Sequence, residues 1–237
     1  MANNFEIPEF QVLSEDTSDF DYSYKIILIG DSNVGKTCLT VRASDNSFND
    51  HYKATVGFEI CNLNLKIKEK KIKIQIWDTC GMEKFRSLIT NFYRKASLVI
   101  IVYSIDDVNS YKDIDIWLNE VQTHTRPDIK VFLIGNKSDL EDERKISKEE
   151  AQKLCKERDL TYFIETSAKN GDNVIPTFAL AASMLLDETL QMTGVKPNNK
   201  AEKNDGQYSF TDYVEDEPKK MVLDNSSDKK RKKKKCC

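Results

Sequence analysis

The sequence contains no long hydrophobic run. No stretch of its 237 residues approaches the roughly 18 to 20 consecutive apolar residues of a membrane span. It also begins without the basic and apolar regions of a secretory signal, which argues against a secretory route. The six cysteines are therefore expected to be reduced thiols of a cytosolic protein; they are Cys38, Cys61, Cys80, Cys155, Cys236 and Cys237.

The sequence also has few histidines and no net positive charge. His51 and His124 are the only histidines, and no Cys/His spacing fits a zinc site. The net charge of −3 excludes a global basic field, so we expect no nucleic-acid partner. The charges are unevenly placed, because seven basic residues form an unbroken run over residues 229–235.

The two ends of the chain differ from its middle. Residues 1–22 carry six acidic residues and no basic one, which predicts a flexible acidic extension. The alternative is that Phe5, Ile7 or Phe10 docks on the folded domain. Residues 195–235 are polar, with no apolar period, and predict a flexible linker that ends in the basic run.

Between these ends, residues 23–194 alternate between strand and helix patterns. The strands are expected near residues 24–29, 58–67, 71–77, 98–103, 131–134 and 162–164. Helical spacing or a helix-start signal covers residues 36–43, 108–121, 147–158 and 174–192. This alternation predicts one α/β domain with a mostly parallel sheet.

The first strand ends in a phosphate-binding motif. Gly30-Asp31-Ser32-Asn33-Val34-Gly35-Lys36-Thr37 matches G-x-x-x-x-G-K-[ST] between a strand and a helix. Successive backbone N–H groups and the helix N-terminus would hold phosphate, Lys36 would reach the β/γ-phosphates, and the Thr37 hydroxyl would ligate Mg²⁺. A chance match in a glycine-containing turn is the alternative. The predicted nucleotide contacts here are Asp31, Ser32, Asn33, Val34, Gly35, Lys36, Thr37 and Cys38.

Three later segments complete the predicted site. Asn136-Lys137-Ser138-Asp139 follows a strand, and a carboxylate there matches the two adjacent donors of guanine, which adenine lacks. The Lys137 stem can cover the base. The segment Ser167-Ala168-Lys169 follows the next strand, and its Ala168 N–H would meet the guanine O6. Asp78 ends another strand, where it would hold Mg²⁺, and Gly81 would turn its N–H towards the γ-phosphate.

In order and spacing, these motifs resemble those of Ras-like small GTPases, and the nearest resemblance is to the Rab branch. The segments similar to Rab signatures are Lys73–Thr79, Glu83–Leu88 and Phe92–Arg94, with Cys236-Cys237 at the end of the chain. The resemblance implies a P-loop NTPase G domain, with a mostly parallel six-stranded sheet that has one antiparallel strand and is flanked by five helices. It also implies that GTP or GDP binds with Mg²⁺ and that Thr55 ligates Mg²⁺ and senses the γ-phosphate. Phe48 would then pack edge-on against guanine.

The chain departs from this family at several positions. Met82 stands where a glutamine orients the attacking water, and a thioether cannot donate a hydrogen bond. We therefore predict a catalytic group of Lys36, Thr55, Gly81 and a defective Met82, with intrinsic hydrolysis slower by a factor of tens, about 2 kcal/mol of barrier. Cys80 replaces a more usual alanine, and Asn33 a common glycine.

The aromatic surface of the family is only partly present. Ile60 stands at a usual aromatic position, and Trp77 and Tyr93 are expected to keep the other two. Effector choice therefore does not transfer from familiar Rabs.

The terminal Cys236 and Cys237 predict double geranylgeranylation through an escort protein, because they follow a basic run and form no C-a-a-X motif. The resemblance implies a monomer on the cytoplasmic face of an endomembrane or vesicle that cycles with the cytosol. Its partners would be effectors on switches I and II, an exchange factor, a GAP and a GDP-dissociation inhibitor. Two alternatives stay open: a GTP-locked scaffold with negligible hydrolysis, and a P-loop kinase or ATPase, against which Asn136 and Asp139 argue.

Overall fold

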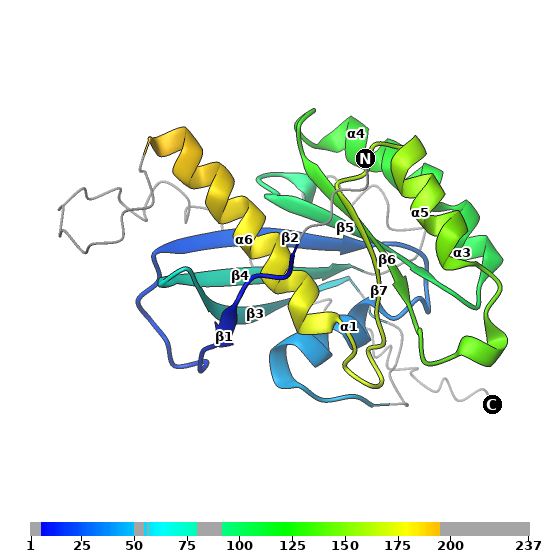
Figure 1. Ribbon diagram of the computed structural model, residues 1–237, viewed down its shortest axis with the longest axis horizontal. Helices are drawn as coiled ribbons and strands as arrows, with labels where there is room; N and C mark the ends of the chain where they lie inside the picture. The colour runs from blue at the N-terminus through cyan, green and yellow to red at the C-terminus, as the bar shows by residue number, and fades with distance from the viewer. Residues whose placement is uncertain (1–5, 50–54, 56, 80–91, 195–237) are drawn as a thin grey trace, which may run out of the picture. The chain divides into compact units, whose positions relative to one another are not determined.

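The computed structural model describes residues 6–49, 55, 57–79 and 92–194. Its strands form one sheet in the order β1-β3-β4-β2-β5-β6-β7, with helices on both faces (Figure 1). The strands are β1 (Phe10–Val12), β2 (Tyr22–Ile29), β3 (Phe58–Ile67), β4 (Lys70–Thr79), β5 (Leu98–Ser104), β6 (Lys130–Asn136) and β7 (Tyr162–Glu165). The helices are α1 (Lys36–Asp45), α3 (Val108–Lys112), α4 (Ile114–His124), the 3₁₀ helix η2 (Glu141–Glu143), α5 (Lys148–Glu157) and α6 (Val174–Thr193).

The predicted fold class is confirmed, with a different number of strands. Strand β3 pairs antiparallel with both of its neighbours, and the other pairings in the described sheet are parallel. Within the described sheet, β3 is therefore the one strand that runs against the rest. The sheet has seven strands instead of six, because β1 lies in the segment that was predicted to be an extension.

The prediction of a flexible extension over residues 1–22 does not hold where β1 joins the sheet. Phe10 and Val12 lie opposite Ile67 and Leu65 of β3, and the backbone N–H of Leu13 donates to the Asn64 carbonyl at 2.8 Å. Phe10 packs against the core, which is the docking alternative named above. The physical reason is that β3 would otherwise expose an unpaired edge.

We expect the Phe10 ring to contribute measurably to stability. Phe10→Ala should lower the free energy of unfolding by about 1 to 2 kcal/mol, because a half-buried ring loses its contacts with the core. Chemical denaturation measures this. The matched control is Ile7→Ala, since Ile7 is 45% exposed. Equal losses in both variants would contradict the docking of Phe10.

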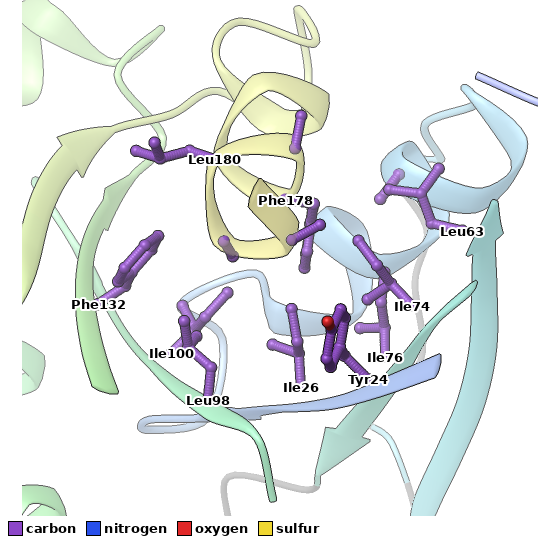
Figure 2. Close-up of a cluster of buried hydrophobic side chains, with 14 of the residues drawn as sticks. Tyr24, Ile26, Leu63, Ile74, Ile76, Leu98, Ile100, Phe132, Phe178 and Leu180 are labelled. Carbon is purple, nitrogen blue, oxygen red and sulfur yellow. The ribbon is translucent and has the colours of Figure 1, made fainter. Parts of the chain in front are cut away.

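The core lies on both faces of the sheet. Along β2, Tyr24, Ile26 and Leu28 face a cluster that includes α1 and α6, whereas Ile27 and Ile29 face a second cluster that includes α4 and α5. This is why the second half of β2, residues 26–29, is a continuous apolar run instead of an alternating one. Figure 2 shows Phe178 and Leu180 of α6 above the strands of the first cluster. No helix among the described residues is long and apolar enough to cross a membrane.

Helix boundaries follow local signals in some places and not in others. At α5, Ser147 and Glu150 form the predicted capping box, with the Ser147 side chain accepting from the Glu150 N–H. The helix predicted over residues 108–121 is instead interrupted at Asp113, which separates α3 from α4.

The carboxyl ends of four parallel strands meet at one edge of the sheet, where ligands bind in open α/β sheets; these strands are β2, β4, β6 and β7.

Candidate functional site

The loop between β2 and α1 has the backbone that a phosphate cradle needs. Gly30, Asn33 and Gly35 have positive φ angles of 139°, 65° and 95°. A Cβ on Gly30 would lie 2.1 Å from the Val102 carbonyl oxygen, so only glycine fits there. Asn33, at the position of a common glycine, adopts a left-handed conformation, which asparagine tolerates. The loop therefore keeps its shape without the common glycine.

Lys36 lies inside this loop. Its side chain is buried, and its ammonium group donates to the backbone carbonyls of Gly30 at 2.8 Å and Asp31 at 2.6 Å. These contacts hold the positive charge within the loop. The arrangement suits the binding of an anion with several negative charges.

Three oxygen-bearing side chains from different segments meet beside Lys36. The Thr37 hydroxyl of α1 lies 2.6 Å from the hydroxyl of Thr55 and donates to Asp78 Oδ2 at 2.5 Å. Asp78, near the end of β4, is fully buried, and its Oδ1 atom has no hydrogen-bond partner among the residues that the structure describes. Burial raises the pKa of the Asp78 carboxyl to about 6, while Thr37 and Lys36 oppose the rise.

These residues fit a magnesium ion. A hard divalent cation prefers hydroxyl and carboxylate oxygens, and it would satisfy the buried Asp78 Oδ1, for which the described part of the chain offers no partner. Thr37, Thr55 and Asp78 are the three residues that the sequence predicted for this role, and the structure brings them together.

The Asn136 side chain is buried between the phosphate loop and the segment that contains Ala168. Its amide donates to the Val34 carbonyl at 2.8 Å, and its Oδ1 accepts from the Thr166 hydroxyl at 3.1 Å and the Ala168 N–H at 3.3 Å. A Cβ on Gly35 would lie 2.3 Å from the Asn136 amide nitrogen, which explains a second obligatory glycine. Asn136 thus joins the phosphate loop to both predicted base-binding segments.

The predicted base-binding side chains lie next to these links. The Ser167 hydroxyl donates to Asp139 Oδ1 at 2.5 Å, which fixes the direction of the carboxylate. Lys137 has a positive φ of 65°, and its ammonium lies 3.7 Å from Asp106. Asp139 and Ser167 come from loops that follow neighbouring parallel strands, as the sequence predicted.

Two arginines support this region, and the sequence analysis missed both. Arg42 of α1 donates to the carbonyls of Ala168 at 2.8 Å and Lys169 at 2.7 Å. Arg144 makes a two-point ion pair with Glu165, the last residue of β7, at 2.7 and 3.0 Å. Because both partners lie far from these arginines in the sequence, no local spacing indicates either contact.

Some of the other predicted site residues lie near the core or outside the described residues. Phe48 and Cys38 are partly buried against the first core cluster, and the edge-on contact of Phe48 with guanine stays a prediction. Ser32 is exposed in the phosphate loop. Cys80, Gly81 and Met82 lie outside the described residues.

The aromatic surface differs from the prediction at one position. Tyr93 is buried and stacks on His124 with ring centroids 5.7 Å apart, so it contributes no exposed ring. Its neighbour Phe92 instead contacts Phe58 and Trp77, at centroid distances of 4.6 and 6.0 Å.

Phe58 and Lys25 complete this aromatic cluster. Phe58 stacks on Trp77 at 5.5 Å, two residues before the non-aromatic Ile60. The Lys25 ammonium lies 3.7 Å from the Trp77 ring centroid, and burial lowers the pKa of Lys25 to about 8.

Comparison with known proteins agrees with this geometry. Residues 25–187 match the model of the Ras family. Rab-13 of Bos taurus is 40% identical over 188 residues, covering 78% of this chain and 91% of the relative. Rab-8B of Homo sapiens is 41% identical, with 67% of this chain and 76% of the relative covered. GTP-binding protein YPTM2 of Zea mays is 41% identical, with 70% and 82% covered. The chain therefore belongs to the Ras family, as a Rab-type small GTPase that takes GTP or GDP with Mg²⁺.

Proposed function

We propose that the chain is a membrane-anchored switch that regulates vesicle traffic through its GTP- and GDP-bound states. The observation that carries the proposal is the position of Thr55. This residue precedes β3, and its hydroxyl meets Thr37 while Thr37 meets Asp78. A loop held at the predicted metal site is ordered when the triphosphate and its ion are bound and released after hydrolysis.

In this proposal each site residue has a distinct role. Mg²⁺, when bound, supplies positive charge that neutralises the β- and γ-phosphate oxygens. Thr37, Thr55 and Asp78 hold it, Lys36 binds the β/γ-phosphates, and Gly81 offers its N–H to the γ-phosphate. Asp139 accepts from the base, the Lys137 stem covers it, and the Ala168 N–H meets its O6, while Asn136 and Ser167 hold these segments in place.

Nucleotide competition tests the proposal directly. Purified full chain loaded with fluorescent GDP should release the label to excess unlabelled GDP or GTP, and ATP at the same concentration should not compete. The reason is that adenine cannot offer two adjacent donors to the Asp139 carboxylate. Displacement by ATP at comparable concentration would overturn the proposal and favour a P-loop kinase or ATPase.

Met82 sets the expected rate of hydrolysis. We predict that Met82→Gln accelerates intrinsic GTP hydrolysis by a factor of tens, about 2 kcal/mol of barrier, because an amide can orient the attacking water and a thioether cannot. Single-turnover hydrolysis of GTP by residues 1–235 measures this, with and without a Rab GAP domain. A GAP that supplies its own glutamine and arginine would restore turnover without the substitution.

The matched control is Met192→Gln, because Met192 is a 70%-exposed methionine at the end of α6. This control should leave the hydrolysis rate unchanged. If Met82→Gln is also without effect, Met82 serves only for packing and the chain is an ordinary timed switch. If the GAP too fails to stimulate the unmodified chain, the alternative of a GTP-locked scaffold is favoured.

The lipid anchor is proposed from the sequence. Cys236 and Cys237 would carry two geranylgeranyl groups added with an escort protein, and the basic run at residues 229–235 would add about 1 kcal/mol per residue at an anionic leaflet. This places the protein on the cytoplasmic face of an endomembrane or vesicle. Its proposed partners are effectors on the switches, an exchange factor, a GAP and a GDP-dissociation inhibitor.

A further inference from the structure

The phosphate-binding loop carries one carboxylate, that of Asp31. Its backbone carbonyl accepts from the Lys36 ammonium at 2.6 Å, so Asp31 belongs to the wall of the cradle. A negative charge in a loop that receives the phosphates of a nucleotide is unfavourable, unless another group holds it away from them. The structure contains such a group.

That group comes from α4. The indole N–H of Trp117 donates to Asp31 Oδ1 at 2.8 Å, and Trp117 itself is buried in the second core cluster. Asp113, four residues earlier, lies on the same side of the helix at the interruption between α3 and α4. A tryptophan with its N–H fixed by the core is a rigid donor, which makes it suited to fixing one position of a carboxylate.

The electrostatics of Asp31 agree with a carboxylate held in a confined place. Burial raises its pKa, and the neighbouring Asp113 carboxyl adds to the rise. The Trp117 hydrogen bond and the Lys36 ammonium oppose it. Its surroundings therefore disfavour the charged form of Asp31, and the Trp117 indole and the Lys36 ammonium favour it.

We propose that Trp117 is a positioning residue that holds the Asp31 carboxylate against α4 and away from the bound phosphates, and that this contact favours binding of the triphosphate over the diphosphate. The difference arises because the γ-phosphate adds negative charge to the cradle, so the triphosphate is the form more sensitive to a misplaced Asp31. The inference rests on the proposed function, since it assumes that the loop binds guanine nucleotides.

The test compares the release of two nucleotides from the full chain. Fluorescent GDP and a fluorescent, uncleavable GTP analogue are each displaced by excess unlabelled nucleotide in the presence of Mg²⁺. Trp117→Phe keeps an aromatic ring and removes the donor. We expect it to accelerate release of the triphosphate analogue about tenfold and release of GDP by less than about threefold. Failure of the unmodified chain to bind either nucleotide would instead overturn the proposed function.

Removing the charge should abolish the selective effect. In an Asp31→Asn background, Trp117→Phe should change release of the two nucleotides equally, because no carboxylate is left to misplace.

Trp77→Phe is the matched control, since Trp77 is the only other tryptophan in the sequence and lies in the aromatic cluster. It should leave the ratio of the two release rates unchanged.

A second variant guards against misfolding of Trp117→Phe. Incorporating 3-benzothienylalanine at position 117 preserves the size of the ring system and replaces the N–H by sulfur. The proposal predicts that this variant, like Trp117→Phe, accelerates release of the triphosphate analogue more than release of GDP. Three results would overturn the proposal and leave Trp117 a packing residue. The first is equal acceleration of both nucleotides in Trp117→Phe and the benzothienyl variant, and the second is no acceleration in either variant. The third is a selective effect that persists with Asp31→Asn.

Discussion

Asp139→Asn is expected to weaken binding of GDP by about 100- to 1,000-fold. The carboxylate offers two acceptors to the two adjacent donors of guanine, and an asparagine amide keeps one acceptor and presents a donor in place of the other. A lost charge-assisted hydrogen bond and a donor facing a donor together amount to about 3 to 4 kcal/mol. Equilibrium titration with fluorescent GDP measures the loss.

The same substitution should change the preferred base. Xanthine carries an acceptor oxygen where guanine carries its amine, so the new amide donor matches xanthine. Xanthosine diphosphate should therefore bind Asp139→Asn more tightly than GDP does. Asp142→Asn, three residues along in the exposed 3₁₀ helix, is the control and should behave as the unmodified chain. A general loss of affinity for both bases would show instead that Asp139 acts through loop folding.

Asp78→Asn is expected to lower the affinity for Mg²⁺ by about 10- to 100-fold. The substitution removes the negative charge of a fully buried group whose Oδ1 has no partner among the described residues, and which the Thr37 hydroxyl bonds at Oδ2. The measurement is the rate of GDP release as a function of Mg²⁺ concentration. In the unmodified chain, removing Mg²⁺ with a chelator should accelerate release; in Asp78→Asn this acceleration should require less chelator.

Asp45→Asn provides the comparison, because Asp45 is an exposed acid at the end of α1. The Mg²⁺ dependence of GDP release should be unchanged in that variant. If Asp78→Asn accelerates release by the same factor at every Mg²⁺ concentration, Asp78 supports the nucleotide pocket without contributing to the metal site.

The parts of the structure that the sequence predicted are those set by local signals. Glycines at defined spacing set the phosphate loop, the apolar residues 26–29 set β2, and a serine and a glutamate three residues apart set the start of α5. Thr37, Thr55 and Asp78 were predicted from motif order and resemblance, and the structure brings them together.

The parts that were missed depend on contacts between distant segments. Strand β1 has only three residues within an acidic segment, and it exists because β3 needs a partner at its edge. The place beside Trp77 was assigned to Tyr93, which is buried, and it is the partly buried Phe92 that contacts Phe58 and Trp77; sequence similarity at two adjacent aromatics does not say which one is buried in the core. Trp117 gave only an apolar helical signal, and its bond to Asp31 spans 86 positions.

The three hydrogen bonds of Asn136 have a consequence for nucleotide release. One buried side chain is bonded to the predicted phosphate loop through Val34 and to the predicted base-binding segment through Ala168. We therefore expect the two segments to be coupled, because moving either one disturbs the side chain that holds the other. A partner that displaces the phosphate loop is therefore expected to loosen the Ala168 segment in the same event.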